Sequence, residues 1–420
     1  MDDLKRLPLN IINQILQYFV KQFDRNYGCN SSLVDPDLTP LFYKELLGLR
    51  LVSKTWSKAV VPFYFNKIHI DDSRDAKVFL DDWNDTLLGA RGSLPVGGLC
   101  IKKLWYSEES TKDDDKDEGG EKEEDAEESI PVSMGQVSRL ISLFGSDLKT
   151  LDITFVRSMG VSSDFIEAIK TMKDLRSLRI SFNYKHSKSG TYDLSSISKL
   201  LSSIPKLENL TFHYDSLDNL ELEPPALSNL RLFSFTYESE TKGLSHIMKT
   251  SKDSLKIIEL FSSTEDPEGL GEVFEPIKDT LEGLFTVCFC EQLYTDVTKL
   301  DFPKLRVLRT EDGADCFVGS IYWLEVPMLK HVRTLVTDLH FSEDYWEKAL
   351  KDAGKDALKE VPNFKHIVFT RDRYLKREGK EINPALVEDF KSRGVQCHVM
   401  DEMTCDEIME LDYKLNGPMN

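Results

Sequence analysis

The sequence predicts an α/β protein in which a small helical module at the N-terminus precedes a repeat solenoid with a curved parallel sheet. Three observations predict this fold class. Short apolar segments recur from Leu148 onward at intervals of 23 to 35 residues, and helical segments lie between several of them. The first 70 residues instead show apolar side chains at helical spacing. A strand followed by a helix, many times over, places the parallel sheet on the concave side and the helices on the convex side.

The recurring unit is L-x-x-L-x-L with conservative variants. Its first positions are 27 residues apart on average, which is the period and signature of leucine-rich repeats. One match has little meaning, but nine at this spacing favour a solenoid over an ordinary α/β domain with parallel strands. The nine units are Leu148-Leu151-Ile153, Leu175-Leu178-Ile180, Leu207-Leu210-Phe212, Leu230-Phe233-Phe235, Leu255-Ile258-Leu260, Leu281-Leu284, Leu305-Leu308, Leu329-Val332 and Phe364-Ile367-Phe369. Two earlier units are predicted at Phe65-Ile68-Ile70 and Ile101-Leu104-Tyr106.

The N-terminal segment predicts two or three helices. Pro8 suits the first position of a helix, where its missing N–H group is not needed. The polar residues 21–39 predict a loop, and Thr39-Pro40 predicts the start of a second helix that Pro62 closes. Further helices are predicted between the repeat strands, beginning near Ser162, Ser195, Ser342 and Asn383.

These patterns divide the chain into five parts. Between Glu108 and Glu128 there are 13 acidic residues and 3 lysines, and such a segment cannot bury enough apolar surface to fold. We therefore predict a disordered acidic insertion within the repeats. The predicted parts are a helical module at 1–70 with its loop at 21–39, the first irregular repeats at 71–106, the acidic insertion at 107–129, the solenoid at 130–400 and a C-terminal cap or tail at 401–420.

Composition excludes several classes of function. The net charge of −19 argues against nucleic-acid binding, which needs Lys and Arg facing phosphates. No run of 18 apolar residues and no secretory signal core occur, so we expect neither a membrane span nor secretion. Seven cysteines without a framework spacing fit reduced thiols in the cytoplasm or nucleus. Their spacing suits no zinc module, and no phosphate-binding loop or hydrolase motif is present. We expect no cofactor, no metal and no catalysis.

The N-terminal module resembles an F-box. The matching pattern is Leu-Pro, an apolar helix, a Leu-rich helix, Val-Ser-Lys-x-Trp and a closing aromatic stretch. With the repeats, it resembles the F-box/leucine-rich-repeat class, which implies a non-catalytic substrate-receptor subunit of an SCF-type ubiquitin ligase. The F-box would bind a Skp-family adaptor and, through it, a cullin. The residues that this resemblance assigns to adaptor binding are Leu7, Pro8, Ile11, Ile12, Ile15, Leu16, Leu49, Val52 and Trp56. The insertion at 21–39 departs from the family pattern, in which the first two helices are joined by a short loop.

The remaining prediction is the surface that would hold a target protein. In each repeat, side chains that alternate with the buried strand positions face the concave side. This surface is mixed in charge, which suits a protein or peptide ligand. The predicted residues are Asp152, Arg179, Thr211, His213, Thr236, Glu259, Phe261, Arg309 and Glu311. The alternative function is a protein-binding scaffold outside the ubiquitin system, in which the F-box-like helices only cap the solenoid.

Overall fold

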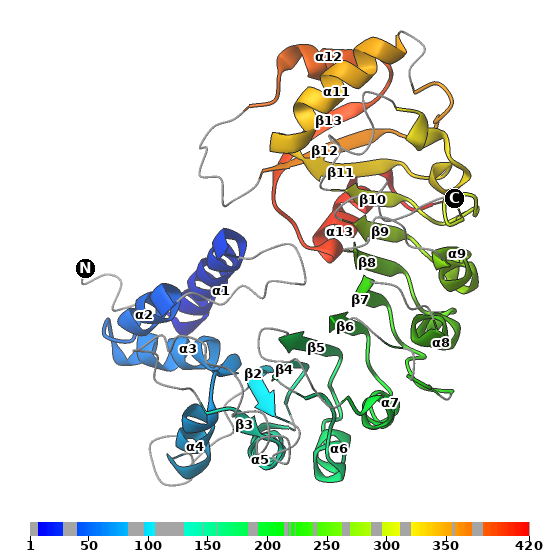
Figure 1. Ribbon diagram of the computed structural model, residues 1–420. Coiled ribbons are helices and arrows are strands. Elements are labelled where there is room, and N and C mark those ends of the chain that lie inside the picture. Colours follow the sequence, from blue (N-terminus) through cyan, green and yellow to red (C-terminus); the bar gives the residue numbers. More distant parts are fainter. Residues whose placement is uncertain are drawn as a thin grey trace, which may run out of the picture. The chain divides into compact units, whose positions relative to one another are not determined.

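The structure of the protein is a computed structural model in which two compact units are distinguished. Unit 1 comprises Met1–Val20, Pro40–Tyr214 and Asn219–Asn229, and unit 2 comprises Lys21–Thr39, Asp215–Asp218 and Leu230–Asn420. Figure 1 shows their helices and strands. The residues that the structure describes are 7–27, 40–82, 96–105, 130–145, 147–156, 158–183, 192–213, 217, 220–222, 224–237, 242–262, 269–286, 296–310, 321–354, 358–371 and 381–419. The predicted acidic insertion and Glu311 lie outside these residues.

The helical module begins the chain, as predicted, with α1 (Leu9–Tyr27), α2 (Pro40–Leu49) and α3 (Lys54–Tyr64). Two predicted boundaries are wrong. The loop does not begin at Lys21, because no glycine or proline interrupts α1 before Gly28. Pro62 does not end α3 either: the Phe65 N–H donates to the Val61 carbonyl at 3.1 Å, so the helix continues past the proline. Residues 28–39 of the predicted loop lie outside the described residues.

Unit 1 then forms a ladder of parallel strands. The strands β1 (Lys67–Ile70), β2 (Gly98–Trp105), β4 (Thr150–Val156), β5 (Ser177–Asn183) and β6 (Asn209–His213) pair in that order, and the short β3 (Val132–Ser133) pairs with β2. The repeat positions coincide across the ladder, because Leu151 pairs with Leu178 and Leu178 with Leu210, and all three are buried. The parallel pairing confirms the predicted repeats in this unit.

Helices cover one side of this ladder (Figure 1). They are α4 (Ser73–Asp82), α5 (Met134–Phe144), α6 (Ser163–Lys170) and α7 (Leu194–Ser202). Polar caps explain where they begin: Ser133 and Gln136 form a capping box at α5, Ser162 caps α6, and Asp193 rather than Ser195 caps α7. The strand side opposite these helices is called the open strand face below.

Unit 2 continues with seven parallel strands among its described residues. They are β7 (Leu232–Tyr237), β8 (Ile257–Ser262), β9 (Gly283–Thr286), β10 (Val307–Thr310), β11 (Thr334–Asp338), β12 (His366–Arg371) and β13 (Gln396–Asp401), paired in that order. The connections contain α8 (Lys242–Ser251), α9 (Leu270–Phe274), η5 (Glu275–Ile277), η6 (Tyr322–Glu325), η7 (Pro327–Leu329), α11 (Leu339–Ala353) and α12 (Pro384–Ser392). Asn383 caps α12 as predicted, whereas α11 begins at Leu339 rather than near Ser342.

The strand register corrects the predicted repeat at β2. Leu99 and Ile101 pair with Leu151 and Ile153, so the repeat there is Val96-Leu99-Ile101 and not Ile101-Leu104-Tyr106. The sequence does not separate the two alternatives because Leu104 is also fully buried, beyond a shift in the register. The repeat predicted at Phe65-Ile68-Ile70 is in the correct frame, since Ile68 pairs with Leu99.

A second correction concerns β11. Leu335 pairs with Leu308 on one side and with Ile367 on the other, so the repeat is Val332-Leu335-Thr337 and not Leu329-Val332. Leu329 is buried as well, but it belongs to the short helix η7 that precedes the strand. Hydrophobicity alone therefore identifies the repeat but not its frame.

The chain ends in α13 (Cys405–Asn416), which lies on the open strand face of unit 2, opposite α8 and α9 (Figure 1). The C-terminal segment that the sequence indicated only as a cap or tail is thus a packed helix. Its place in the fold determines which surfaces of the protein remain accessible.

Candidate functional site

The first candidate binding surface is the outer face of α1. Pro8, Ile11, Ile15 and Tyr18 follow helical spacing along one side of the helix and are exposed, with 36% of Ile11, 38% of Ile15 and 66% of Tyr18 accessible. Neighbouring exposed apolar side chains of this kind mark interaction sites on soluble proteins. Tyr18 is not among the residues predicted to bind an adaptor, because its aromatic ring was not counted in the helical pattern.

The inner face of the same helix belongs to the core. Ile12 and Leu16 are fully buried, and Trp56 is 4% exposed. Ser53 caps α3 by accepting the Trp56 N–H at 3.3 Å, so the Val-Ser-Lys-x-Trp motif supplies both a helix start and a core side chain. Three of the residues predicted to bind an adaptor, Ile12, Leu16 and Trp56, are therefore buried within the protein and are not part of its exposed surface.

The second candidate surface is the open strand face of unit 1. The strand register places Asp152, Arg179 and Thr211 side by side across β4, β5 and β6, and His213 follows two residues after Thr211 on the same face. The Arg179 Nε lies 3.7 Å from the Asp152 Oδ2, which forms an ion pair. Arg179 and Thr211 are half-buried, and Asp152 and His213 are 9% exposed. These four predicted residues are thus brought together.

In unit 2 the strand face opposite the helices, which corresponds to the open strand face of unit 1, is covered by the C-terminal segment. Apolar side chains of β8 to β12 pack against apolar side chains of α13 and against Met403, which lies just before this helix. This cluster consists of Ile257, Phe285, Val307, Val336 and Val368 from the strands and Met403, Cys405, Ile408 and Met409 from the C-terminal segment. A Cβ atom on Gly283 would lie 2.6 Å from the Met409 Sδ, so the missing side chain of Gly283 allows Met409 to approach β9.

A buried carboxylate anchors α13 to the strands. Asp412 has no exposed surface and accepts hydrogen bonds from Arg333 Nη2 at 2.8 Å, Thr334 Oγ1 at 2.7 Å and Asn416 Nδ2 at 3.0 Å. Arg306 is its second ion-pair partner. Two guanidinium groups and two neutral donors thus satisfy one carboxylate, which is the condition under which a charge is tolerated in a protein interior.

The network continues across the residues that directly precede β8, β9 and β10. Arg306 Nη2 also lies 3.2 Å from Glu282, and Lys256 Nζ lies 2.8 Å from the other oxygen of Glu282. Burial alone raises the pKa of Glu282, but Lys256 and Arg306 outweigh it, so the pKa of this carboxyl is below its ordinary value. Glu282 is therefore held ionised beside the arginine.

A pair of histidines lies next to the anchor. The His366 Nδ1 and His398 Nε2 atoms are 3.0 Å apart on β12 and β13. Burial lowers the pKa of both rings, and the neighbouring His398 lowers the pKa of His366 further, whereas Asp412 acts in the opposite direction. The pair therefore favours the neutral form, in which one ring donates and the other accepts.

The covered face corrects the predicted target surface. Glu259, Phe261 and Arg309 are buried, and the charges of Glu259 and Arg309 act on the buried thiol of Cys405 in α13. Glu259 and Arg309 thus lie near α13, and Phe261 is also withdrawn from solvent. Thr236 on β7 is half-buried.

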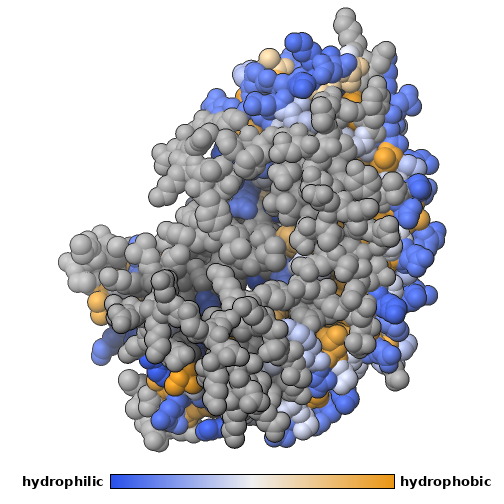
Figure 2. All heavy atoms as spheres, in the orientation of Figure 1, coloured by the Kyte–Doolittle hydropathy of each residue, from blue (hydrophilic) through white to orange (hydrophobic). Residues whose placement is uncertain are grey.

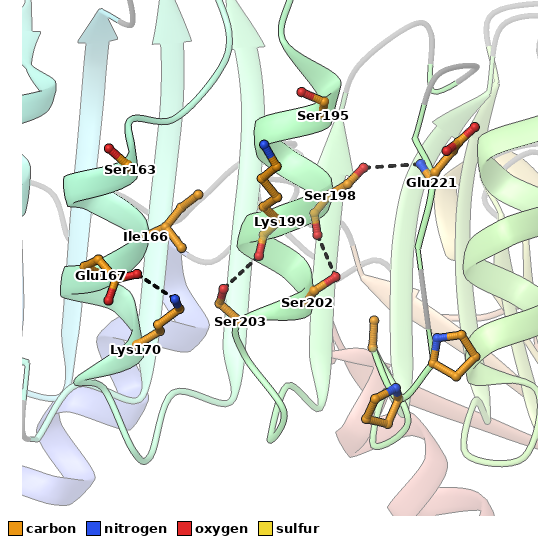
Figure 3. A pocket seen from close by; sticks show the side chains of 13 residues that line it. Ser163, Ile166, Glu167, Lys170, Ser195, Ser198, Lys199, Ser202, Ser203 and Glu221 are labelled. Carbon is orange, nitrogen blue, oxygen red and sulfur yellow. Dashed lines mark hydrogen bonds and ion pairs between the residues drawn. The ribbon is translucent and has the colours of Figure 1, made fainter.

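A groove of about 800 Å³ lies on the helix side of unit 1 (Figure 3). It is lined by one face of α6, one face of α7, Glu221 and residues 224–226. Its serines serve the helices: Ser198 Oγ donates to the Leu194 carbonyl at 3.0 Å and Ser202 Oγ to the Ser198 carbonyl at 2.8 Å. Lys170 is paired with Glu167 at 2.6 Å. The groove therefore presents hydroxyls used by the backbone and no convergent reactive set.

The edge of unit 2 formed by α8 and α9 is mainly hydrophilic, with isolated apolar side chains (Figure 2). Among the described residues, no three His, Cys, Asp or Glu side chains are placed to hold a metal ion. Within the same residues, no helix combines the length and the apolar character that crossing a membrane requires. Burial raises the pKa of the Cys397 thiol to about 12, which keeps it protonated at neutral pH.

Comparison with known proteins adds little. No protein-family model and no curated protein matches the sequence. One solved structure that the structural comparison matches is titled "Crystal structure of TLR13-ssRNA13 complex"; it shares 12% sequence identity, covers 74% of this chain with a TM-score of 0.34, and is matched over 48% of its own length. This chain thus spans about half of that neighbour. A likeness at this level assigns neither a function nor a ligand.

Proposed function

We propose that the protein is the substrate-recognition adaptor of an SCF-type ubiquitin ligase. The N-terminal helices would dock a Skp-family adaptor and, through it, a cullin, while the repeat strands would hold a target protein. The chain itself performs no chemistry; it raises the local concentration of the target near a conjugating enzyme that carries out the transfer.

The observation that carries this proposal is the exposed outer face of α1. A helix that buries Ile12 and Leu16 on one side and leaves Pro8, Ile11 and Ile15 accessible on the other suits a partner that receives it in a groove. Leu51, which is 89% exposed directly after α2, adds apolar surface within the same module. The resemblance of this module to an F-box supplies the identity of the partner.

The target surface follows from the contrast between the units. In unit 2 the strand face opposite the helices is covered by α13. In unit 1 the Asp152–Arg179 pair and Thr211 lie on the open strand face, where the flanking side chains on the same side of the strands are polar. We assign first contact with a target protein to this unit 1 face. Its hydroxyl and charged side chains suit a polar polypeptide segment.

The test is the affinity of the purified full-length chain for a Skp-family adaptor. The Ile11→Asp/Ile15→Asp variant should bind at least ~100-fold more weakly, because two apolar side chains worth about 1.5–3 kcal/mol each are replaced by charges. Leu143→Asp on α5 is the matched control, since Leu143 is 36% exposed in the same unit. It should bind as the unchanged chain does.

Adaptor binding that is absent in the unchanged chain, or equal in both variants, would contradict the proposal. The alternative, a scaffold whose N-terminal helices only cap the repeats, is favoured by one observation: α3 leads into β1, where Ile68 and Ile70 already occupy repeat positions. In that case the unchanged chain binds no adaptor, and the Ile11→Asp/Ile15→Asp variant binds the same partners as the unchanged chain.

A further inference from the structure

The helix α13 occupies the open strand face of unit 2 as a bound peptide helix occupies a groove. Its inward side chains Cys405, Ile408, Met409 and Asp412 follow the spacing i, i+3, i+4 and i+7, which is the pattern of helix-in-groove recognition. Thr404 and Glu407 close a capping box, so the helix begins with its own hydrogen bonds. α13 therefore has a single binding face and an independent start.

The groove beneath α13 has two chemically distinct parts. Its floor is apolar and is formed by Ile257, Phe285, Val307, Val336 and Val368. At the end occupied by Asp412, Arg333 and Thr334 donate hydrogen bonds and Arg306 adds a second positive charge. Such a surface selects an amphipathic helix with two adjacent apolar side chains followed, one turn later, by a carboxylate.

We propose that this strand face is a binding site for amphipathic helices of protein targets, and that α13 is a built-in occupant that keeps it closed. The proposal rests on the function proposed above, which supplies the targets, and adds their chemistry and their control. A target helix and α13 compete for the same floor and the same two arginines. Because α13 is tethered, it is present at an effective concentration on the order of millimolar, so a target gains access only as α13 leaves.

The first test uses a labelled synthetic peptide with the sequence of residues 403–419, titrated into full-length protein. Full-length protein carrying Ile408→Asp/Met409→Asp, which removes the apolar contacts of α13, should bind the peptide. The unchanged chain should bind it at least ~100-fold more weakly, because its own helix occupies the groove. A peptide with Asp412→Asn should lose at least ~10-fold in affinity for the variant, because its carboxylate is missing opposite Arg306 and Arg333.

Equal binding of the peptide by the variant and the unchanged chain, or no binding by a variant that is folded by circular dichroism, would overturn the proposal. Amide hydrogen exchange of the unchanged chain provides a second test that does not depend on the variant. Amides of 405–416 should exchange at least ~10-fold faster than those of β10 and β11, because α13 opens without unfolding the sheet. Exchange at the same rate would make α13 a permanent part of the fold and would refute an exchangeable occupant.

The two proposals fail separately. The Ile11→Asp/Ile15→Asp variant should lose the Skp-family adaptor and keep the peptide binding and hydrogen exchange of the unchanged chain. If this variant loses the adaptor as expected, but the Ile408→Asp/Met409→Asp variant does not bind the peptide, only the proposed role of α13 is rejected. A peptide site without adaptor binding would leave a helix-binding repeat protein outside the ubiquitin system.

Discussion

The two units present the same strand positions with opposite chemistry. Two residues after the first repeat position, β4 to β6 of unit 1 have Thr150, Ser177 and Asn209, whereas β8 to β10 of unit 2 have Ile257, Gly283 and Val307. The leucine positions of the repeat are buried in both. Short polar side chains on a strand need no cover, but strands that are apolar on both faces must be buried on both. The intervening positions, not the leucines, thus decide whether a repeat face is open or occupied.

The covered face also differs in how it holds charge. In unit 1 the ion pair of Arg179 and Asp152 is 3.7 Å long, and its side chains keep 22% and 13% of their surface accessible. In unit 2 Asp412 is fully buried and shares two arginines. A buried network is costly to disrupt, since removing one partner leaves the other charges without compensation. We therefore expect charge substitutions to matter far more under α13 than on the open face of unit 1.

The largest effect should come from Asp412→Ala. It leaves Arg306 and Arg333 facing each other beneath α13 and should lower the free energy of unfolding by about 3–5 kcal/mol. Urea denaturation of the full chain measures this change. Glu410→Ala is the control: Glu410 lies on the exposed side of the same helix, 2.8 Å from Lys414, and its loss should change stability little. Equal effects of the two substitutions would show that α13 is not anchored through its buried carboxylate.

A smaller effect should appear as a pH dependence specific to unit 2. Burial depresses the pKa of His366 and His398 in the folded protein, so the unfolded chain binds protons first as the pH falls. The free energy of unfolding should therefore decline as the pH falls below about 6.5, the ordinary pKa of histidine, and level off below the folded-state values. Denaturation at a series of pH values measures the slope.

The variant His366→Gln/His398→Gln should lose this part of the slope. Glu282 provides an internal reference, because its lowered pKa places its own contribution in a more acidic range, where stability is lost as the carboxylate becomes protonated. If the free energy of unfolding still falls with pH near pH 6 in the double variant, other titratable groups cause this dependence. The histidine pair would then not contribute to the stability of unit 2 through its protonation.

The sequence predicted the fold class through its period, but not every frame. The repeat strands were identified because apolar residues recur at fixed spacing, whereas Leu104 and Leu329 were assigned to the wrong repeat positions because they are as buried as the true ones. Register depends on pairing between strands that are distant in the sequence, and hydrophobicity carries no information about that pairing.

The covered face was partly readable from the sequence. The strands Val307–Thr310 and Thr334–Asp338 each contain two adjacent apolar residues, Val307-Leu308 and Leu335-Val336, whose side chains point to opposite faces, as in strands buried on both sides. That pattern predicts a cover but not its identity. Arg333 and Arg306 are 79 and 106 residues from Asp412, and no local motif connects residues so far apart. The sequence therefore did not show that Glu259 and Arg309 are buried beside α13.

The smallest effect should be that of Arg179→Ala on the open face of unit 1. Its partly exposed ion pair should contribute about 0–1 kcal/mol to stability, whereas Arg306→Ala, the same substitution beneath α13, leaves Asp412 with a single arginine and should cost several times more. Paired urea denaturation curves measure the difference. A large loss for Arg179→Ala would mean that unit 1 depends on its open face as unit 2 depends on α13. A negligible loss leaves the charges of that face available to a partner, because the fold does not need them.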